Sequence, residues 1–327
     1  MRSKKLKTAL QLLLFALLGG GVIWYMFGQM SAAQKDQMRE SVRHLRYSMI
    51  PLFIGATLLS DWSRAKRWQL MLRPLGTTPG TVNTVLSVII GYLVNLVPPR
   101  AGEVAKCTVL ARYEKIPADK MIGTIVAERA WDAVCLLLII LGGLTWQASV
   151  MSDTARASLM EHLPKGQSLV LMAGLMLGFA GALFAVYRYR PGSRISRFIH
   201  GLADGVSSIW RIRERGSFLF HTCLIWTCFV IQILIGFYAL PGTSGLGIGP
   251  AVMVLIFGSV AMIASPGGLG LYPFLTALIL TSGYGVSEAD AQAFGWVTWG
   301  MMTAVIILLG IGGLLILPVY NRRKTNT

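Results

Sequence analysis

Three ionisable residues fall within five positions of an otherwise apolar segment: Glu128, Arg129 and Asp132. Residues four apart lie on one face of a helix, so Glu128 and Asp132 face the same way, and Arg129 lies three residues from Asp132. Within a membrane, such charges are costly unless they pair or line a wet cavity. The spacing predicts an internal ion-pair cluster that locks this segment to a helical hairpin expected at about 82–113, or a pathway for a polar substrate or protons. Both can hold at once.

A second charged group follows the dipeptide Pro98-Pro99 and consists of Arg100, Glu103 and Lys106. Glu103 falls in the first turn of a short helix-like run, where the helix dipole stabilises a carboxylate, so capping is an alternative role for it. An arginine at a membrane-embedded turn needs a carboxylate, a phosphate or water. We therefore expect Arg100 to contact a lipid headgroup, or to share carboxylates with Arg129.

Other polar residues in apolar segments have more ordinary interpretations. Asp61 lies close to Arg64 and Arg67 near the end of an apolar segment, which predicts an interfacial ion pair. Asn95, one turn before Pro98, is expected to hydrogen-bond between helices. Four tryptophans are typical of membrane-interface anchors: Trp62, Trp68, Trp296 and Trp299.

The amino-acid composition indicates the class of protein to which these residues belong. Of 327 residues, 54% are hydrophobic and 13% are charged, whereas soluble domains carry about 25% charged residues. The apolar residues form long blocks, which excludes a soluble globular enzyme, a disordered chain and a secreted disulfide scaffold. The formal net charge is +16, but the bases flank apolar blocks and no nucleic-acid motif is present. We expect membrane phospholipid or glycolipid as the partner, and no nucleic acid, metal or cofactor.

Apolar blocks of sufficient length predict an all-α polytopic membrane protein. The first block follows four bases and resembles a signal peptide, but about 20 apolar residues exceed the 7–15 of a signal core. We therefore expect a first membrane helix there. The predicted spans are 8–27, 48–70, 120–146, 168–187, 217–240 and 291–317.

Two apolar stretches break at Pro/Gly clusters instead of spanning. Their first limbs, 82–97 and 251–264, fall short of the ~20 residues that a span needs, and each ends in a cluster that stops a helix. Both predict helical hairpins with tips inside the membrane, at about 82–113 and 250–283. Two ordinary, kinked spans in each stretch are the alternative.

The same order of elements, with an odd number of crossings, occurs twice. A shift of 167 residues places Gly91 on Gly258 and Pro99 on Pro266. We expect a single integral membrane domain made of a first repeat, 1–147, and an inverted second repeat, 148–327. Inverted repeats with interrupted helices are typical of transporters.

The second limb of each hairpin would begin deep in the membrane, with free N–H groups facing a shared interior. Ser265 and Pro266 suit the N-cap and N1 positions of such a limb, and Gly267 and Gly268 allow close backbone approach. This arrangement favours an anion such as a phosphate. A plain structural kink is the alternative.

Basic residues predict the orientation. With the N-terminus inside, eighteen Lys and Arg fall in cytoplasmic segments and six in outer ones, which places both termini in the cytoplasm. An amphipathic stripe over 195–209, flanked by arginines, predicts a helix lying on the membrane surface.

Four motifs, taken together and in order, resemble the lysylphosphatidylglycerol synthase transmembrane family, the flippase-like membrane domain of the multiple peptide resistance factor. The motifs are Arg64-x-x-Arg67-Trp68, the run from Gly91 to Glu103, Glu128-Arg129-x-x-Asp132 and Pro266-Gly267-Gly268-Leu269-Gly270. The resemblance implies re-entrant hairpins and movement of a polar lipid between leaflets. It also implies that six residues line the headgroup cavity: Asn95, Arg100, Glu103, Glu128, Arg129 and Asp132.

This chain departs from the family pattern in its second half. Lys106 stands where arginine is common, Leu271-Tyr272-Pro273 replaces a frequent glutamate, and the last span has Trp296 and Trp299 but not the usual arginine. No soluble synthase domain is expected, so lipid aminoacylation is not expected either.

These observations lead to a specific functional expectation. We expect a lipid flippase or transporter, not an enzyme, in the bacterial cytoplasmic membrane. Its expected substrate-binding residues are Asn95, Arg100, Glu103, Lys106, Glu128, Arg129, Asp132, Ser265, Gly267 and Gly268. A membrane-embedded enzyme acting on a lipid-linked intermediate, or a non-transporting scaffold in cell-envelope synthesis, is the alternative.

Overall fold

A computed structural model describes residues 28, 31–96, 101–150 and 212–325. Throughout these ranges the regular structure is helical. Four features predicted from the sequence lie outside them: the first span at 8–27, the span at 168–187, the surface helix at 195–209, and Arg100.

One order of elements, a long helix, two short helices and a long helix, occurs twice, as the sequence predicts. After the short helix α2 (Ala32–Arg43), the first set comprises α3 (Met49–Leu72), α4 (Thr81–Asn95), α5 (Ala101–Glu114) and α6 (Ala118–Val150). The second set comprises α10 (Arg215–Ala239), α11 (Ile248–Ala264), α12 (Leu271–Tyr284) and α13 (Glu288–Thr325). The inversion of one set against the other in the membrane stays a prediction.

Local sequence signals end and begin these helices. Gly285 follows α12 with a φ of 66°, and its N–H bonds to the carbonyls of Leu280 and Thr281, which closes the helix with a left-handed residue. Ser287 then starts α13: its hydroxyl accepts the Asp290 N–H at 3.2 Å and donates to the Asp290 carboxylate at 2.7 Å. This reciprocal cap allows a turn of three residues between two antiparallel helices.

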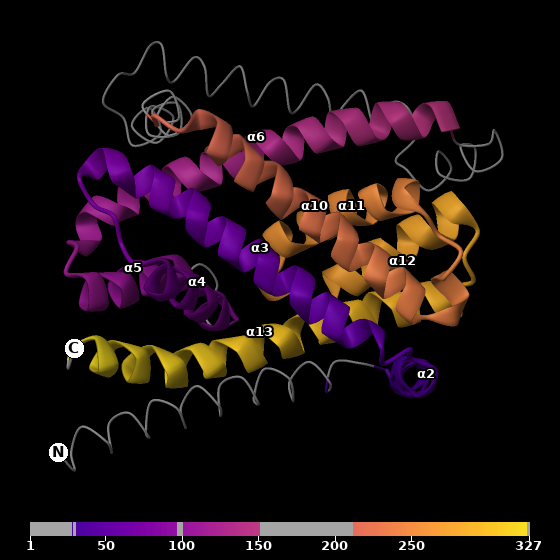
Figure 1. Ribbon diagram of the computed structural model, residues 1–327. Helices are drawn as coiled ribbons and strands as arrows, with labels where there is room; N and C mark the ends of the chain where they lie inside the picture. The colour runs from indigo at the N-terminus through magenta and orange to yellow at the C-terminus, as the bar shows by residue number, and fades with distance from the viewer. Residues whose placement is uncertain (1–27, 29–30, 97–100, 151–211, 326–327) are drawn as a thin grey trace.

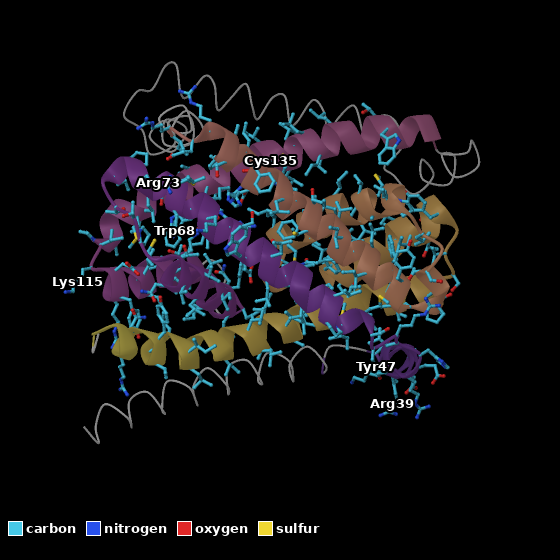
Figure 2. All side chains as sticks on the ribbon, in the orientation of Figure 1. Arg39, Tyr47, Trp68, Arg73, Lys115 and Cys135 are labelled. Atoms are coloured by element: carbon cyan, nitrogen blue, oxygen red, sulfur yellow. The ribbon has the colours of Figure 1, made fainter. Side chains whose placement is uncertain are left out.

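The long helices frame the two hairpins (Figure 1). α3 crosses the middle of the molecule and packs against α10, while α6 and α13 run along opposite sides. The hairpin α4–α5 lies at one end and α11–α12 at the other. α13 packs on α12 and also on α4, and α6 packs on α5 and also on α11, so each outer helix joins both sets. Figure 2 places Arg73 and Lys115 at the α4–α5 end and Arg39 at the opposite end.

Glycine brings the limbs of the first hairpin into backbone contact. A Cβ on Gly91 of α4 would lie 2.9 Å from the carbonyl oxygen of Gly102 of α5, and a Cβ on Gly102 would overlap the carbonyl oxygen of Gly91. In the second hairpin, Gly258 meets the ring of Tyr272 instead. The first hairpin is therefore the more tightly closed of the two.

The tryptophan prediction is mostly wrong. Trp68 is fully buried in a core shared by α3, α4, α5 and α6, and its indole N–H donates to Thr124 at 2.9 Å (Figure 2). Trp296 and Trp299 are also buried and pack edge-to-face against each other. Trp62 alone is exposed, as an interface anchor should be. Burial prevails because each buried ring fills space between helices that only the fold brings together.

The C-terminal end of α13 is fastened to the first hairpin by polar side chains. Asn83 and Asn321 exchange amide hydrogen bonds at 3.0 and 2.7 Å, and Glu114 accepts a further bond from Asn83. Asn83 is 1% exposed. This contact ties the last helix of the chain to the first half.

Candidate functional site

A network of seven charged side chains joins α3, α5 and α6. We call it the charge network; it comprises Arg64, Arg67, Glu103, Lys106, Glu128, Arg129 and Asp132. Four members are cations and three are carboxylates. The predicted internal ion-pair cluster is thus confirmed, and it locks α6 to the second limb of the first hairpin, as the spacing indicates.

Glu128 is the centre of the charge network. Its side chain is fully buried, and one carboxylate oxygen accepts from Arg129 at 2.7 Å and from Arg64 at 3.2 Å. The other oxygen accepts from Lys106 at 2.6 Å. A carboxylate in an apolar interior is stable only when its charge is paired and its lone pairs are bonded, and these donors meet both conditions.

Asp132, one turn further along α6, binds the same face of α3. It accepts hydrogen bonds from Arg67 at 2.7 Å and from Arg64 at 3.2 Å, and it forms an ion pair with Arg129 at 3.2 Å. Arg67 is completely buried and also lies 3.5 Å from Glu128. The i, i+4 spacing of the carboxylates therefore matches the i, i+3 spacing of Arg64 and Arg67 on the facing helix.

The charge network is open at one side. Arg129 is 42% exposed and Glu103 is 30% exposed, and their ion pair is loose at 3.5 Å. In the buried part, the Nε–H groups of Arg64 and Arg67 have no hydrogen-bond acceptor among the described residues. Unpaired buried donors of this kind are uncommon and favour an additional acceptor. The network therefore offers both an accessible cation and unused buried donors to an anion.

Sequence reasoning missed two members of the site, Arg64 and Arg67, and the interfacial ion pair expected for Asp61 is wrong, because Asp61 is buried and forms no ion pair with a described residue. Arg64 and Arg67 were expected as interfacial charges paired with Asp61, but they are buried and pair with Glu128 and Asp132. The sequence contained a signal for this pairing. Glu128 and Asp132 carry two negative charges, and Arg129 beside them neutralises only one, so this apolar helix needed a cation from another segment.

Asn95 closes the tip of the first hairpin. Its side-chain oxygen accepts the backbone N–H of Gly102 at 2.8 Å, seven residues later. The expected hydrogen bond between helices is confirmed, and it lies within the hairpin, beside the charge network.

Replacing Asn95 by Ala should therefore destabilise the protein by about 1 kcal/mol, because one helix-start N–H loses its acceptor. Thermal unfolding of the purified protein in detergent measures this loss. Thr145→Ala in α6, which removes an exposed hydroxyl bonded only to its own helix, is the control. Equal effects of the two substitutions would contradict a capping role for Asn95.

The second hairpin tip differs from expectation. Ser265 is not the N-cap of the second limb: it ends α11, and its hydroxyl donates back to the Ala261 carbonyl at 3.0 Å. Gly267, Gly268 and Gly270 all have positive φ, so the chain makes a 3₁₀ turn first and α12 begins at Leu271. The expected N-cap is wrong because three glycines with positive φ delay the helix start from Pro266 to Leu271.

The close approach predicted for these glycines is made by the protein itself. The Gly267 carbonyl accepts the indole N–H of Trp299 at 2.9 Å, and a Cβ on Gly268 would lie 2.5 Å from the Met262 sulfur. No Asp, Glu, Lys or Arg occurs between positions 216 and 287. No hydrogen bond of the described residues joins Ser265, Gly267 or Gly268 to the charge network, whose seven members all belong to the first half.

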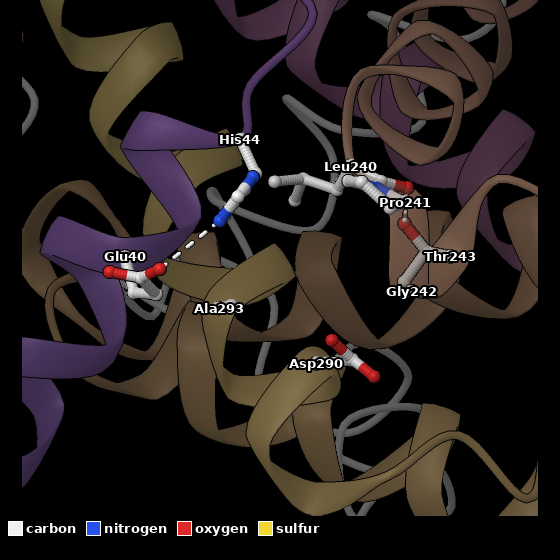
Figure 3. A pocket seen from close by; sticks show the side chains of 8 residues that line it. All are labelled: Glu40, His44, Leu240, Pro241, Gly242, Thr243, Asp290 and Ala293. Atoms are coloured by element: carbon white, nitrogen blue, oxygen red, sulfur yellow. Dashed lines mark hydrogen bonds and ion pairs between the residues drawn. The ribbon is translucent and has the colours of Figure 1, made fainter.

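A cavity of about 290 Å³ lies at the opposite end of the molecule (Figure 3). Glu40, His44 and Asp290 contribute its titratable side chains, and His44 bonds to Glu40 at 3.1 Å while Asp290 stands apart. Asp290 already serves as the cap partner of Ser287. The described residues contain no group of three side chains placed to hold a metal ion.

The described residues form only helices, several of them strongly apolar, which agrees with a helical membrane protein. Among the described residues, α10 and the part of α13 from Glu288 to Arg322 are long and apolar enough to cross a membrane by themselves. The chain belongs to the family described as the lysylphosphatidylglycerol synthase TM region, whose model matches residues 9–323. The resemblance seen in the sequence motifs is thereby confirmed.

A distant relative carries the name of an enzyme. The protein named Glycosyltransferase AglD, from Haloferax volcanii, is 24% identical over an alignment of 296 residues that covers 78% of this chain and 47% of that protein. The chain thus spans about half the length of this curated relative. No solved structure matches the chain.

Proposed function

We propose that the protein moves a polar, phosphate-bearing lipid between the two leaflets of the membrane, with the charge network as the headgroup site. The observation that supports this most is the imbalance of the network. Its four cations face three carboxylates, so it has one positive charge in excess. An excess cation inside a membrane protein needs an anion, and a phosphate monoanion or diester supplies one.

Arg129 is the member that meets the headgroup first in this proposal. It is the most exposed cation of the network. Of its three ion pairs, the one with Glu103 is the longest. A phosphate can therefore replace Glu103 on Arg129 without disturbing the shorter bonds to Glu128 and Asp132. The unused Nε–H groups of Arg64 and Arg67 mark where an acceptor would be favourable deeper in the protein.

Leaflet exchange in proteoliposomes tests this proposal. Fluorescent phosphatidylglycerol, phosphatidylethanolamine and phosphatidylcholine are compared, and the outer-leaflet fluorophore is quenched chemically. Arg129→Ala should slow exchange of the preferred lipid at least about tenfold, because one charge-assisted phosphate contact is lost. Arg112→Ala is the matched control, since Arg112 is an exposed arginine of α5 outside the network. Wild-type protein that moves none of these lipids would contradict the proposal.

The glycosyltransferase name of the relative favours a second lipid class. A lipid-linked sugar also carries phosphate and would use the same cations.

The enzyme alternative is tested in the same vesicles by mass spectrometry of the extracted lipids. Our proposal expects lipid redistribution without any change in lipid mass, whereas a mass change that depends on the network would favour a membrane-embedded enzyme.

A further inference from the structure

Asp61 is a buried carboxylate that the charge network leaves without a partner. It lies in α3, is 6% exposed, and its side chain forms no hydrogen bond or ion pair with any described residue. The carboxylates of the network differ sharply from it: Glu128 pairs with four cations, Asp132 with three, and Glu103 with one. Burying an unpaired carboxylate is expensive when it is ionised.

Protonation therefore has very different consequences at these four sites. A proton on Glu128 or Asp132 would break several short ion pairs and leave buried guanidinium groups uncompensated. A proton on Asp61 breaks no described ion pair and relieves an unpaired buried charge. Among the carboxylates near the site, Asp61 is thus the one that can change its protonation state while the network keeps its geometry.

The surroundings of Asp61 connect it to the network through Arg64. Arg64 lies one turn further along α3 and interacts electrostatically with Asp61. From α4, the ring of Tyr92 lies 5.8 Å from the Arg64 guanidinium and also interacts with Asp61. From α6, Glu128 and Asp132 reach Arg64 from its other side.

The third helix that packs against α3, α10, adds no fixed charge. Between Gly216 and Ala239 it has no Asp, Glu, Lys or Arg. Its His221 bonds to Ser63 at 3.0 Å. The charge on Asp61 therefore interacts mainly with Arg64, which belongs to the network.

We infer that Asp61 is a proton-binding residue that couples proton uptake to headgroup binding; this inference rests on the proposed function. With Asp61 ionised, the network and Asp61 together are neutral. With Asp61 protonated, they carry one positive charge, which matches one phosphodiester. A proton enters from water on one side, binds the Asp61 carboxylate, and returns to water after the headgroup leaves, so one proton accompanies one anionic lipid and no covalent bond changes.

A pH gradient across proteoliposomes tests the coupling. Fluorescent phosphatidylglycerol is followed in wild type, in Asp61→Asn, which is permanently neutral, and in Asp36→Asn, which removes an exposed carboxylate of α2. Wild type and Asp36→Asn should exchange the lipid faster at acidic pH and accumulate it in one leaflet under the gradient. Asp61→Asn should still exchange it, but without pH dependence or accumulation. An Asp61→Asn protein that responds to pH as wild type does would overturn the inference.

Further measurements separate this inference from the function on which it rests. If wild type moves no phosphatidylglycerol, the proposed function fails, and infrared difference spectra between acidic and neutral pH then test Asp61 alone. The carbonyl band of a protonated carboxylic acid should appear in wild type and Glu103→Gln and be absent in Asp61→Asn. If Asp61→Asn does not fold, Asp61→Glu, which keeps the carboxyl group, should retain pH-dependent exchange with a shifted midpoint. A wild-type exchange rate independent of pH, or the same band in all variants, would overturn the inference.

Discussion

Replacing Glu128 by Gln should destabilise the protein by about 3–5 kcal/mol and abolish lipid movement. The side chain is fully buried, and its two oxygens pair with Lys106 and three arginines. A neutral amide cannot compensate these charges, and its NH₂ group would point at one of the cations. Thermal unfolding in detergent and leaflet exchange in vesicles measure the two effects. Glu288→Gln, at the exposed start of α13, should change neither.

A second substitution shows whether the loss comes from uncompensated charge. Adding Lys106→Met to Glu128→Gln removes the buried ammonium group that Glu128 holds at 2.6 Å. The double variant should therefore be more stable than Glu128→Gln alone, because deleting both partners leaves fewer buried charges unpaired. Simple addition of the two destabilisations would show that the ion pair is not what Glu128 contributes.

Replacing Gly102 by Ala should prevent the first hairpin from closing. The new methyl group would overlap the carbonyl oxygen of Gly91 and lie 2.6 Å from the side-chain carbon of Asn95. Overpacking usually costs about 1–3 kcal/mol when side chains can yield, and here a backbone must move, so we expect a loss at the upper end of that range or beyond. The displaced α5 would also carry Glu103 and Lys106 away from α6.

Gly123 provides the matched control, because it lies inside α6 with no neighbouring atom within 4 Å of an added Cβ. Gly123→Ala should leave stability unchanged or raise it by up to about 1 kcal/mol through helix propensity. Both variants are compared by thermal unfolding and by the yield of monodisperse protein. A Gly102→Ala protein as stable as Gly123→Ala would contradict the close contact between α4 and α5.

The helices were predictable because apolar length and Pro/Gly breaks act locally. The spans expected at 48–70 and 217–240 became Met49–Leu72 and Arg215–Ala239, and both hairpins appear with helical limbs on either side of the expected breaks. Glu103 lies in the first turn of α5, as its position predicts. These features depend on residues within a few turns of one another.

The burial and the ion-pair partners of Arg64 and Arg67 could not be predicted from the local sequence. Next to Lys66 and Arg73, they look like the basic flank of an apolar helix. Their burial depends on carboxylates more than sixty residues away, and no local pattern encodes that pairing. Ser265 could not be placed for a local reason. A serine beside a proline suits either end of a helix. The positive φ angles of the three glycines that follow determine that Ser265 ends α11 and does not begin α12.

The pairing of α3 with α6 also constrains how the chain enters the membrane during synthesis. An insertion machinery that tests one segment at a time would accept α10 or α13 by apolarity alone, but α3 contains Asp61, Arg64, Lys66 and Arg67. Each charge near the centre of a helix adds about 2.5–3.5 kcal/mol to the free energy of insertion. Because the carboxylates that pair with Arg64 and Arg67 lie on α6, we expect α3 to enter the bilayer fully only after α6 has been translated. We therefore expect the ion pairs of the charge network to contribute to the insertion of the first half of the chain as well as to the site.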